Sequence, residues 1–349
     1  MRKTYTELLN EMGPAALKWQ PGLQLKNSNG DIAPSTLGYQ YTIQTTTLIR
    51  AKTIEQKFYE VPPADFVPMV VGEGAWLESI QTNLVYDSAG DFENGVISLS
   101  DPSDLAQVSA GLAPVAAKIV TWAKGYQYST PEIEKALASN NWDAVSAKQS
   151  VLKRNWDLGI QKIAFLGMKS DLSNVPGLLS NSNVNVNTGI ITQAISSLTA
   201  AQFSTFVKAL LADYFANSNS TVLPDSFVMP MDDFLGLGVP VSSSFPNIMM
   251  IDYLLEAFKK MTGNANFQVR GVLYGKQSAN AGYWATLGTN RYVLYRKNSE
   301  TIRMDLPVDF ILNAPNTGNN FLWEGVGCGQ YTGAIAYRPA EIRYYDWAA

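Results

Sequence analysis

The chain has 349 residues, of which 46% are hydrophobic, and a formal net charge of −4 at pH 7. This length is enough for two domains, or for one domain with large excursions, and the apolar content is enough for substantial cores. An acidic chain without a basic arm does not neutralise nucleic acid directly, which excludes a protein that condenses DNA onto itself by charge.

The composition also removes most of the common catalytic machinery. The chain has no histidine, which excludes Ser-His-Asp and Cys-His sites and deprives a metal site of its commonest ligand. The single cysteine, Cys328, forms no intrachain disulfide or thiolate zinc cluster, and it fits a chain made in a reducing cytosol. The glycine-rich segment 325–329 has no helix pattern after it and is therefore no dinucleotide-binding loop. Because Asp232 and Asp233 suit the start of a helix better than a catalytic or metal site, we expect no enzymatic activity, no cofactor and no metal.

The first 45 residues have the pattern of an arm rather than of a core. No apolar stretch follows the first residues, so we expect no secretory signal, and no run of about 18 apolar residues predicts a membrane span. Apolar residues between positions 8 and 19 predict a short amphipathic helix, which Gly13 and Pro14 interrupt. Apolar and polar residues then alternate, so residues 46–63 are assigned to strands of the main body.

The stretch from residue 60 to residue 117 is acidic and contains no Lys or Arg. Turn signals near residues 72–74, 88–91 and 101–103 separate short β-prone segments. A long hairpin cannot bury a core of its own, and a stretch of one charge sign is usually only a solvated surface. Short strands joined by turns are therefore expected in this stretch. The acids in this stretch are Glu60, Asp65, Glu73, Glu78, Asp87, Asp91, Glu93, Asp101 and Asp104.

Two helices are predicted after this stretch. Thr130 is the expected N-cap of a short helix, with Pro131 at its first position. A long helix follows over residues 142–166, because its apolar residues recur at three- and four-residue steps. We expect Trp156 and Ile163 on this helix to be fully buried against a sheet, and Gly167 to end it.

Residues 189–290 alternate between helical and strand patterns. Helices are predicted over residues 190–198, 200–216 and 253–261, and another begins at Asp232. A short buried strand bounded by prolines is predicted over residues 222–230. The last part of the chain is predicted to close the main body with strands at 291–297, 302–310 and 331–342, where Pro339 suits the end of a strand.

The order of these elements resembles the major capsid proteins of tailed bacteriophages, which share the Hong Kong 97-type fold, and their encapsulin relatives. The resemblance covers roughly residues 40–345 and is strongest at 126–179 and 300–345, where the short capped helix, the long helix, the turn at 176–179 and the final strands follow in order. It implies an α+β fold with these parts: an N-terminal arm (1–45), peripheral-domain strands (46–63), an extended loop (64–117), a peripheral domain with spine helix 142–166 (118–188), an axial domain (189–290) and closing peripheral-domain strands (291–349).

The resemblance implies a structural function. The expected protein assembles through pentamers and hexamers into an icosahedral shell around double-stranded phage DNA, which it encloses without sequence-specific binding and without a membrane. It is made in the host cytoplasm, resides in the virion, and works with separate scaffold, portal and decoration proteins. An encapsulin-type nanocompartment is one alternative. A carboxylate-only carbohydrate-active or carbohydrate-binding protein is another, because 8 Trp and 17 Tyr suit sugar stacking as well as protein interfaces.

In the family that this chain resembles, the extended loop lies across a neighbouring subunit. The acidic loop is therefore expected to dock over basic residues of the neighbour's spine helix, or else to make an apolar contact through Trp76, Leu77 and Phe92. The loop carries no lysine, so we expect a shell without covalent cross-links from this loop. The candidate intersubunit contacts are Glu73, Trp76, Glu78, Asp87, Asp91, Phe92 and Glu93 on the loop, and Lys153, Arg154 and Lys162 on the helix.

Overall fold

The computed structural model describes residues 57–88, 109–138, 144–242, 245–283, 289–319 and 321–347. The chain divides into two compact units, Met1–Phe58 and Tyr59–Ala349. Every described helix and strand belongs to the second unit, which combines both types in an α+β fold. The predicted arm over residues 1–45 lies outside the described residues, and so do Asp91, Phe92 and Glu93.

A five-stranded sheet separates two hydrophobic cores. Its strands, in spatial order, are β5 (Val186–Asn187), β16 (Ile342–Trp347), β10 (Asn290–Tyr295), β6 (Ser226–Pro230) and β9 (Gln268–Val272). Side chains alternate along a strand, so Val293 and Tyr295 face one core whereas Tyr292 and Leu294 face the other. Within the predicted closing segment 291–349, β10 and β16 therefore contribute side chains to both cores.

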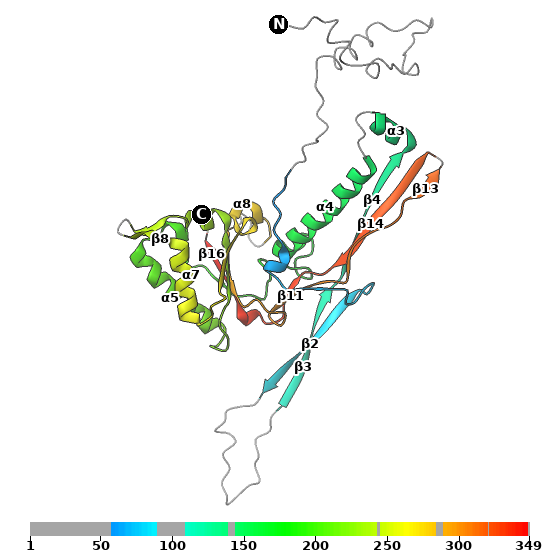
Figure 1. The fold of residues 1–349 in the computed structure, drawn as a ribbon. Helices are drawn as coiled ribbons and strands as arrows, with labels where there is room; N and C mark the ends of the chain where they lie inside the picture. Colours follow the sequence, from blue (N-terminus) through cyan, green and yellow to red (C-terminus); the bar gives the residue numbers. More distant parts are fainter. Residues whose placement is uncertain are drawn as a thin grey trace, which may run out of the picture. The chain divides into compact units, whose positions relative to one another are not determined.

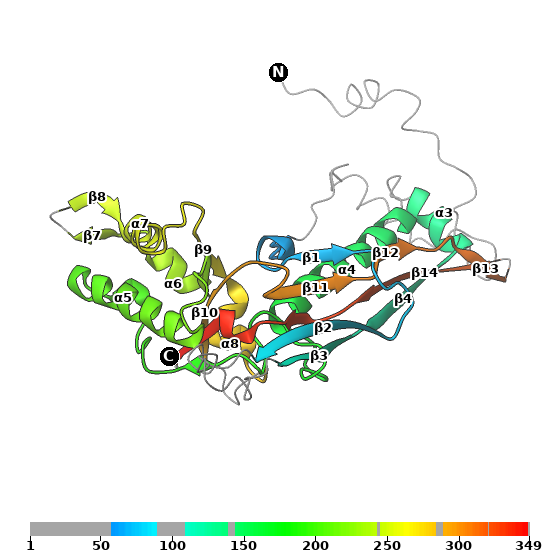
Figure 2. The same ribbon diagram turned by 90° about the horizontal axis from the view of Figure 1, so that it is seen from below.

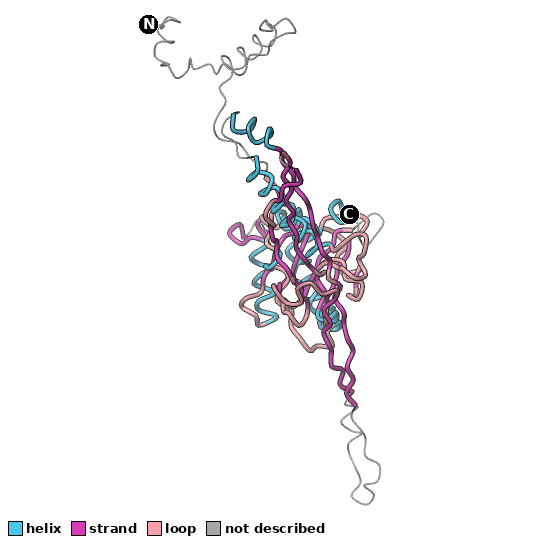
Figure 3. Tube along the Cα trace, turned by 90° about the vertical axis from the view of Figure 1, so that its right-hand side faces the viewer, coloured by secondary structure: helices cyan, strands magenta, loops and turns pink. Residues whose placement is uncertain are grey.

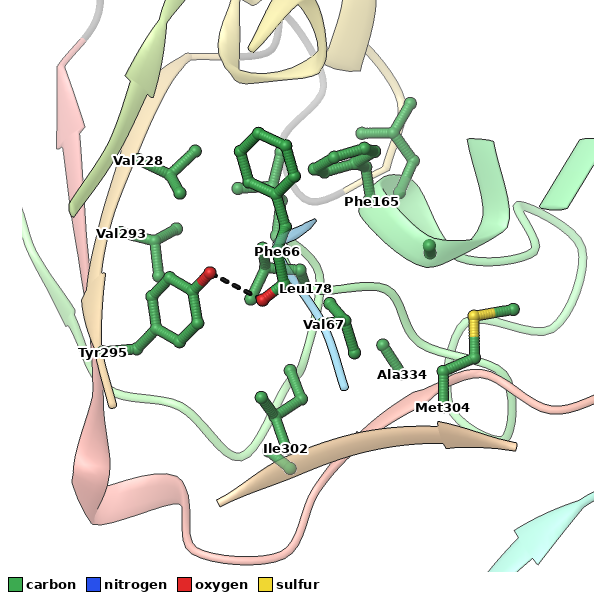
Figure 4. Packing of buried hydrophobic residues seen from close by; sticks show 14 of the residues in the cluster. Phe66, Val67, Phe165, Leu178, Val228, Val293, Tyr295, Ile302, Met304 and Ala334 are labelled. Carbon is green, nitrogen blue, oxygen red and sulfur yellow. Dashed lines mark hydrogen bonds between the residues drawn. The ribbon is translucent and has the colours of Figure 1, made fainter. Parts of the chain in front are cut away.

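The first core lies between this sheet and the C-terminal end of α4 (Ala144–Leu166), as Figure 4 shows. The rings of Phe66 and Phe165 meet edge to face, with centroids 5.0 Å apart. The Tyr295 hydroxyl donates a hydrogen bond of 2.7 Å to the carbonyl oxygen of Phe66. This bond satisfies a polar group that is removed from water, and burial raises the pKa of Tyr295 so that it remains a donor.

The second core is covered by α5 (Ala200–Asn217) and α7 (Met250–Thr262), which pack against each other (Figure 1). α6 (Met231–Gly236) directly follows the fully buried β6. Gly263 ends α7 in the left-handed conformation, with a φ of 67°, as glycine after a helix commonly does. The predictions of helices over 200–216 and 253–261 and of a helix at Asp232 are confirmed.

The helix predicted over residues 190–198 is wrong. Only η4 (Ile195–Ser197), a single 3-10 turn, forms in this segment. Thr199 and Gln202 make a capping box that begins α5 after η4. The Asp233 carboxylate accepts hydrogen bonds of 2.8 Å from the first two backbone N–H groups of η4. A side chain from another helix thus satisfies these donors.

α4 lies along one face of a four-stranded sheet (Figures 1 and 2). In this sheet β14 (Leu322–Tyr331) runs between β4 (Val120–Ser129) on one side and β12 (Val308–Leu312) and β13 (Asn316–Asn319) on the other. A Cβ atom at Gly329 would lie 2.5 Å from the Trp156 ring, and one at Gly327 would lie 2.7 Å from Leu152. The glycine-rich segment is thus a strand on which the helix packs closely.

The long helix ends at Leu166 as predicted, and residues 142 and 143 lie outside the described part. Trp156 is 3% exposed, which confirms its predicted burial. The full burial predicted for Ile163 is wrong, because this residue packs at the edge of the first core and is half-buried. The preceding α3 (Thr130–Ala138) is capped by Ser129 instead of Thr130: the Ser129 hydroxyl accepts a hydrogen bond of 3.4 Å from the Glu132 N–H.

β2 (Ser79–Ser88) and β3 (Ser109–Lys118) form an antiparallel ribbon, which is visible in Figures 1 and 3. The predicted start of this loop at residue 64 is wrong, because the chain up to β1 still belongs to the body. η2 (Pro63–Asp65) leads into Phe66 and Val67, which are buried in the first core. β1 (Met69–Val71) then pairs in parallel with β11 (Ile302–Leu306), whose other neighbour is β15 (Ala334–Ala336).

The strand predicted over residues 302–310 is interrupted. Pro307 separates β11 from β12, and proline cannot donate a hydrogen bond to a sheet. The remaining described elements are β7 (Pro240–Ser242), β8 (Phe245–Met249), η5 (Leu273–Gly275), α8 (Gln277–Asn280) and η6 (Pro339–Glu341).

Candidate interaction surfaces

The loop between β1 and β2 holds three residues in the left-handed backbone region. Gly72 and Gly74 have φ values of 92° and 78°, which glycine adopts readily, but Trp76 has a φ of 64°, which is a true outlier for a bulky residue. The Trp76 N–H donates a hydrogen bond of 2.7 Å to Oε1 of Gln330, and Nε2 of Gln330 donates one of 2.9 Å to the Thr121 hydroxyl. Since Gln330 is only 3% exposed, a buried amide holds this loop.

The same loop presents large apolar side chains to solvent. Val71 is 60% exposed, Trp76 64% and Leu77 58%. The side chains of Glu73 and Glu78 are also exposed and flank them. Three of the candidate contact residues, Glu73, Trp76 and Glu78, thus form with two neighbours an apolar surface with acidic surroundings. We call this surface the Trp76 knob; its residues are Val71, Glu73, Trp76, Leu77 and Glu78.

The β2–β3 ribbon carries apolar side chains on both faces. On one face, Ile80, Leu84 and Ala117 pack against Ile335 and Tyr337 of the body. On the other face, Val85 and Leu112 stand directly opposite each other, 64% and 69% exposed. An isolated two-stranded ribbon is marginally stable in water at best, and exposed apolar pairs of this kind mark interaction surfaces. Asp87 lies on β2, three positions beyond Leu84.

An ion pair fastens the root of the ribbon to the body. Nζ of Lys118, at the end of β3, lies 2.7 Å from Oδ2 of Asp171, in the segment after α4. The hydrogen bond from Lys118, with a second from Asn174, holds the pKa of Asp171 below its usual range. The Ile119 N–H also donates to the carbonyl oxygen of Glu78, at 3.0 Å. The direction in which the ribbon leaves the body is therefore set by contacts at both of its strands.

The three predicted basic partners on α4 do not form one basic surface. Nζ of Lys153 lies 3.2 Å from the Asp157 carboxylate, one helical turn further along the chain, and 5.7 Å from the centre of the Phe310 ring. Arg154 is half-buried. Lys162 is exposed, but at about 100° per residue it lies on roughly the opposite side of the helix from Lys153.

A groove of about 330 Å³ lies between α4 and β4. Lys124 and Lys148 line it, and Nζ of Lys148 is fixed by Glu132 at 2.6 Å and by the Gln127 carbonyl oxygen at 2.9 Å. The hydrogen bond from Lys148 lowers the pKa of the Glu132 carboxyl. The floor is mostly apolar, with Val151 62% exposed. We call this site the α4–β4 groove; its lining is Lys124, Gly125, Tyr126, Ala147, Lys148, Val151, Leu152 and Asn155.

The described residues contain no catalytic or metal centre at the acidic pair. Asp233 is buried and accepts hydrogen bonds from η4 and, at 3.0 Å, from the Tyr292 hydroxyl, while Asp232 pairs with Lys276 at 2.5 Å. No cluster of three or more potential metal-ligating side chains occurs in the described part of the chain. Within the same residues no helix is long and apolar enough to cross a membrane.

Sequence reasoning missed several residues that organise these surfaces. Gln330, Lys118 and Asp171 were not among the candidate contacts, and neither was the groove at Val151. The position of Gln330 could have been noticed in the sequence, because it lies between glycines and a tyrosine, directly before a predicted strand. A buried amide at such a position must find hydrogen-bond partners. The other three carry no local signal, since their partners lie far away along the chain.

The chain is similar to known proteins both in sequence and in structure. A family model described as major capsid protein matches residues 96–347. The capsid chain of Myoviridae phage XM1 is similar in structure, with a TM-score of 0.70 at 14% identity over 87% of this chain and 97% of that chain. A chain of Mycobacterium phage Che8 has a TM-score of 0.52 at 9% identity, covering 86% and 96%, and the capsid of the native GTA particle has 0.52 at 12%, covering 87% and 97%. No curated protein matches the chain.

Proposed function

Because the chain belongs to the family of major capsid proteins, we propose that its copies assemble through pentamers and hexamers into an icosahedral shell around double-stranded phage DNA. The family model covers most of the chain, and this match is the observation that carries the proposal. The likeness to the capsid of phage XM1 shows that the fold is of the Hong Kong 97 type. A shell subunit of this kind is a structural component of the virion, with an arm at 1–45, an axial domain around the second core and a peripheral domain around α4.

The exposed apolar pair of the β2–β3 ribbon supports an overlap between neighbouring subunits. The β2–β3 ribbon exposes Val85 and Leu112 on the face that its own body leaves bare. A neighbouring copy that covers this pair removes apolar surface from water, which is the main favourable term in association. The ribbon of one subunit therefore lies across the body of the next.

The charges on the neighbour contribute less than the apolar contact. Lys153, Arg154 and Lys162 remain candidate partners for the acidic ribbon, but exposed ion pairs contribute only about 0.2–1 kcal/mol each. Their sum over many repeated interfaces sets the register of the overlap and makes assembly sensitive to salt. Enclosed DNA is held without sequence-specific contacts, and separate scaffold, portal and decoration proteins complete a virion whose subunits are made in the host cytoplasm.

The shell function is tested by expressing the full chain and measuring particle size. We expect shells or their capsomers by sedimentation and negative-stain electron microscopy. A small oligomer that binds or cleaves glycans, with no particles at any protein or salt concentration, would refute the shell and favour a carbohydrate-active protein.

The electrostatic part has its own test. Reversing Lys153, Arg154 and Lys162 together to Glu is expected to lower the particle yield and shift its salt dependence. The matched control reverses Lys208 and Lys260, two exposed bases on α5 and α7. If the α4 variant keeps the wild-type yield and salt tolerance, the charges on α4 have no part in docking.

A further inference from the structure

We propose that the Trp76 knob of one copy inserts into the α4–β4 groove of a second copy, and that Gln330 is the positioning residue that holds the knob in place. The inference rests on the proposed shell function, which supplies the second copy.

The backbone of Trp76 is held in the left-handed region. A left-handed conformation at a bulky residue is strained and persists only where the surroundings enforce it. Here the enforcing group is the buried amide of Gln330, which takes the Trp76 N–H at 2.7 Å. The indole nevertheless stays 64% exposed, so the strained conformation brings no burial to the described subunit. Tryptophan held out toward solvent in this way is typical of an anchor that a partner covers.

The α4–β4 groove has the properties that such an anchor needs. Its lining is mostly apolar, its volume of about 330 Å³ admits a large aromatic side chain, and Val151 in this lining is 62% exposed. No described element covers Val151. Aromatic side chains that fill apolar pockets carry most of the energy of typical protein interfaces.

The charges around the two surfaces are complementary. Glu73 and Glu78 flank the knob with exposed carboxylates, and no basic residue occurs between Lys57 and Lys118. Lys124 and Lys148 line the groove. Because Lys148 is already paired with Glu132, Lys124 supplies the positive charge for this contact. Opposite charges around an apolar centre select the correct partner and its orientation, even where each pair adds little affinity.

The two surfaces of one subunit face in different directions. Gln330 and Thr121, which anchor the knob, stand opposite each other in the β14–β4 pairing. Lys124 and Tyr126 lie at positions of the other parity on β4, so they face α4 from the opposite side of the sheet. Knob and groove are therefore different surfaces that meet only between copies, which is a head-to-tail contact that generates a ring when the rotation closes.

Substitutions at the two surfaces test the contact in the full-length chain. Trp76→Ala and Val151→Glu are each expected to lower the assembled fraction roughly tenfold or more at fixed protein concentration, as loss of an interface anchor does. Trp76→Phe, which keeps an aromatic ring, is expected to retain most of it. Because both positions are exposed, urea unfolding of the dissociated subunits should match wild type. Trp76→Ala that assembles like wild type overturns the inference while the shell function stands.

A charge exchange tests the pairing of the two surfaces. Lys124→Glu alone is expected to reduce assembly, and adding Glu78→Lys to the same chain is expected to restore it, since every copy then carries the reversed pair. The matched control adds Glu300→Lys, an exposed acid elsewhere, and is expected to restore nothing. Equal rescue by both second changes, or none by Glu78→Lys, contradicts the contact. Wild-type chains that form no particles at all would overturn the shell function itself.

Gln330 is tested through its dependence on Trp76. Gln330→Leu removes the acceptor for the Trp76 N–H and is expected to reduce assembly by a similar factor. If Gln330 acts by holding the knob, the double variant Gln330→Leu/Trp76→Ala assembles no worse than Trp76→Ala alone. A residue that matters only for folding would add its own loss, so a multiplied defect in the double variant overturns the positioning role.

Discussion

Trp156→Ala removes the largest side chain that α4 contributes to the contact with its sheet. Trp156 is 3% exposed, and its ring packs against Trp122, Phe310 and Tyr331 with centroids 5.3, 6.4 and 6.0 Å apart. Truncating a buried tryptophan typically costs about 3–5 kcal/mol, because the surrounding structure relaxes only partly. Trp156 also lines a surface cleft of about 500 Å³, so water can enter the new cavity. We therefore expect a loss near the lower end of that range, about 3 kcal/mol.

Gly329 on β14 lies directly against the Trp156 ring and allows a second, independent substitution at the same contact. A Cβ atom at Gly329 would lie 2.5 Å from the Trp156 ring, so Gly329→Ala alone overpacks the contact and is expected to cost about 1–3 kcal/mol. In the double variant the new methyl group enters the space that the indole leaves. The two losses should then fall short of additivity by about 1 kcal/mol or more.

Urea unfolding of dissociated subunits, followed by far-ultraviolet circular dichroism, measures these changes in the free energy of unfolding. Trp76→Ala is the matched control, because that tryptophan is 64% exposed and its loss should change stability by about 0.5 kcal/mol or less. A cost below about 1 kcal/mol for Trp156→Ala, or strictly additive losses with Gly329→Ala, would refute the packing described for α4.

Three further predictions follow from other contacts. Arg291 holds Asp346 through two hydrogen bonds of 2.6 Å in a buried site, so Arg291→Met should cost about 3–5 kcal/mol in urea unfolding, and adding Asp346→Leu should recover much of it. The pKa of Asp171 is lowered by Lys118, so their pair stabilises the fold at pH values above the ordinary pKa of the carboxyl. This stabilisation is lost as the pH falls through the lowered pKa. Lys118→Met should remove this part of the acid dependence of the urea midpoint, and an unchanged dependence would contradict the pairing. The ribbon and its root contain no lysine before Lys118, so boiled, denatured particles should give a single monomer band, whereas a ladder of covalent oligomers would disprove a shell without cross-links from this loop.

The elements that the sequence predicted well are those whose signals lie within a few residues. α4, α5 and α7 have apolar residues at helical spacing, and Gly263 ends α7 where a left-handed residue is required. The turn signals and short β-prone segments of the acidic stretch agree with the antiparallel pairing of β2 and β3. The resemblance in the order of elements indicated the capsid family, which the family model confirms.

Other features depend on partners that are distant along the chain. The hairpin was predicted to start at residue 64, but Phe66 and Val67 complete a core whose other walls come from α4 and β10. The 3-10 turn at η4 replaces a predicted helix because Asp233, on another element, takes its N–H groups. No local pattern records such a competitor.

The sequence by itself determined the long helices α4, α5 and α7, the presence of a hairpin before α3, and the absence of histidine-based chemistry. The tertiary structure alone decided which surfaces the ribbon and α4 present. The exposed Trp76 keeps its left-handed conformation above the buried amide of Gln330, which lies 254 positions away along the chain. Periodicity is a property of neighbouring residues, whereas a surface is made by segments that meet only after folding.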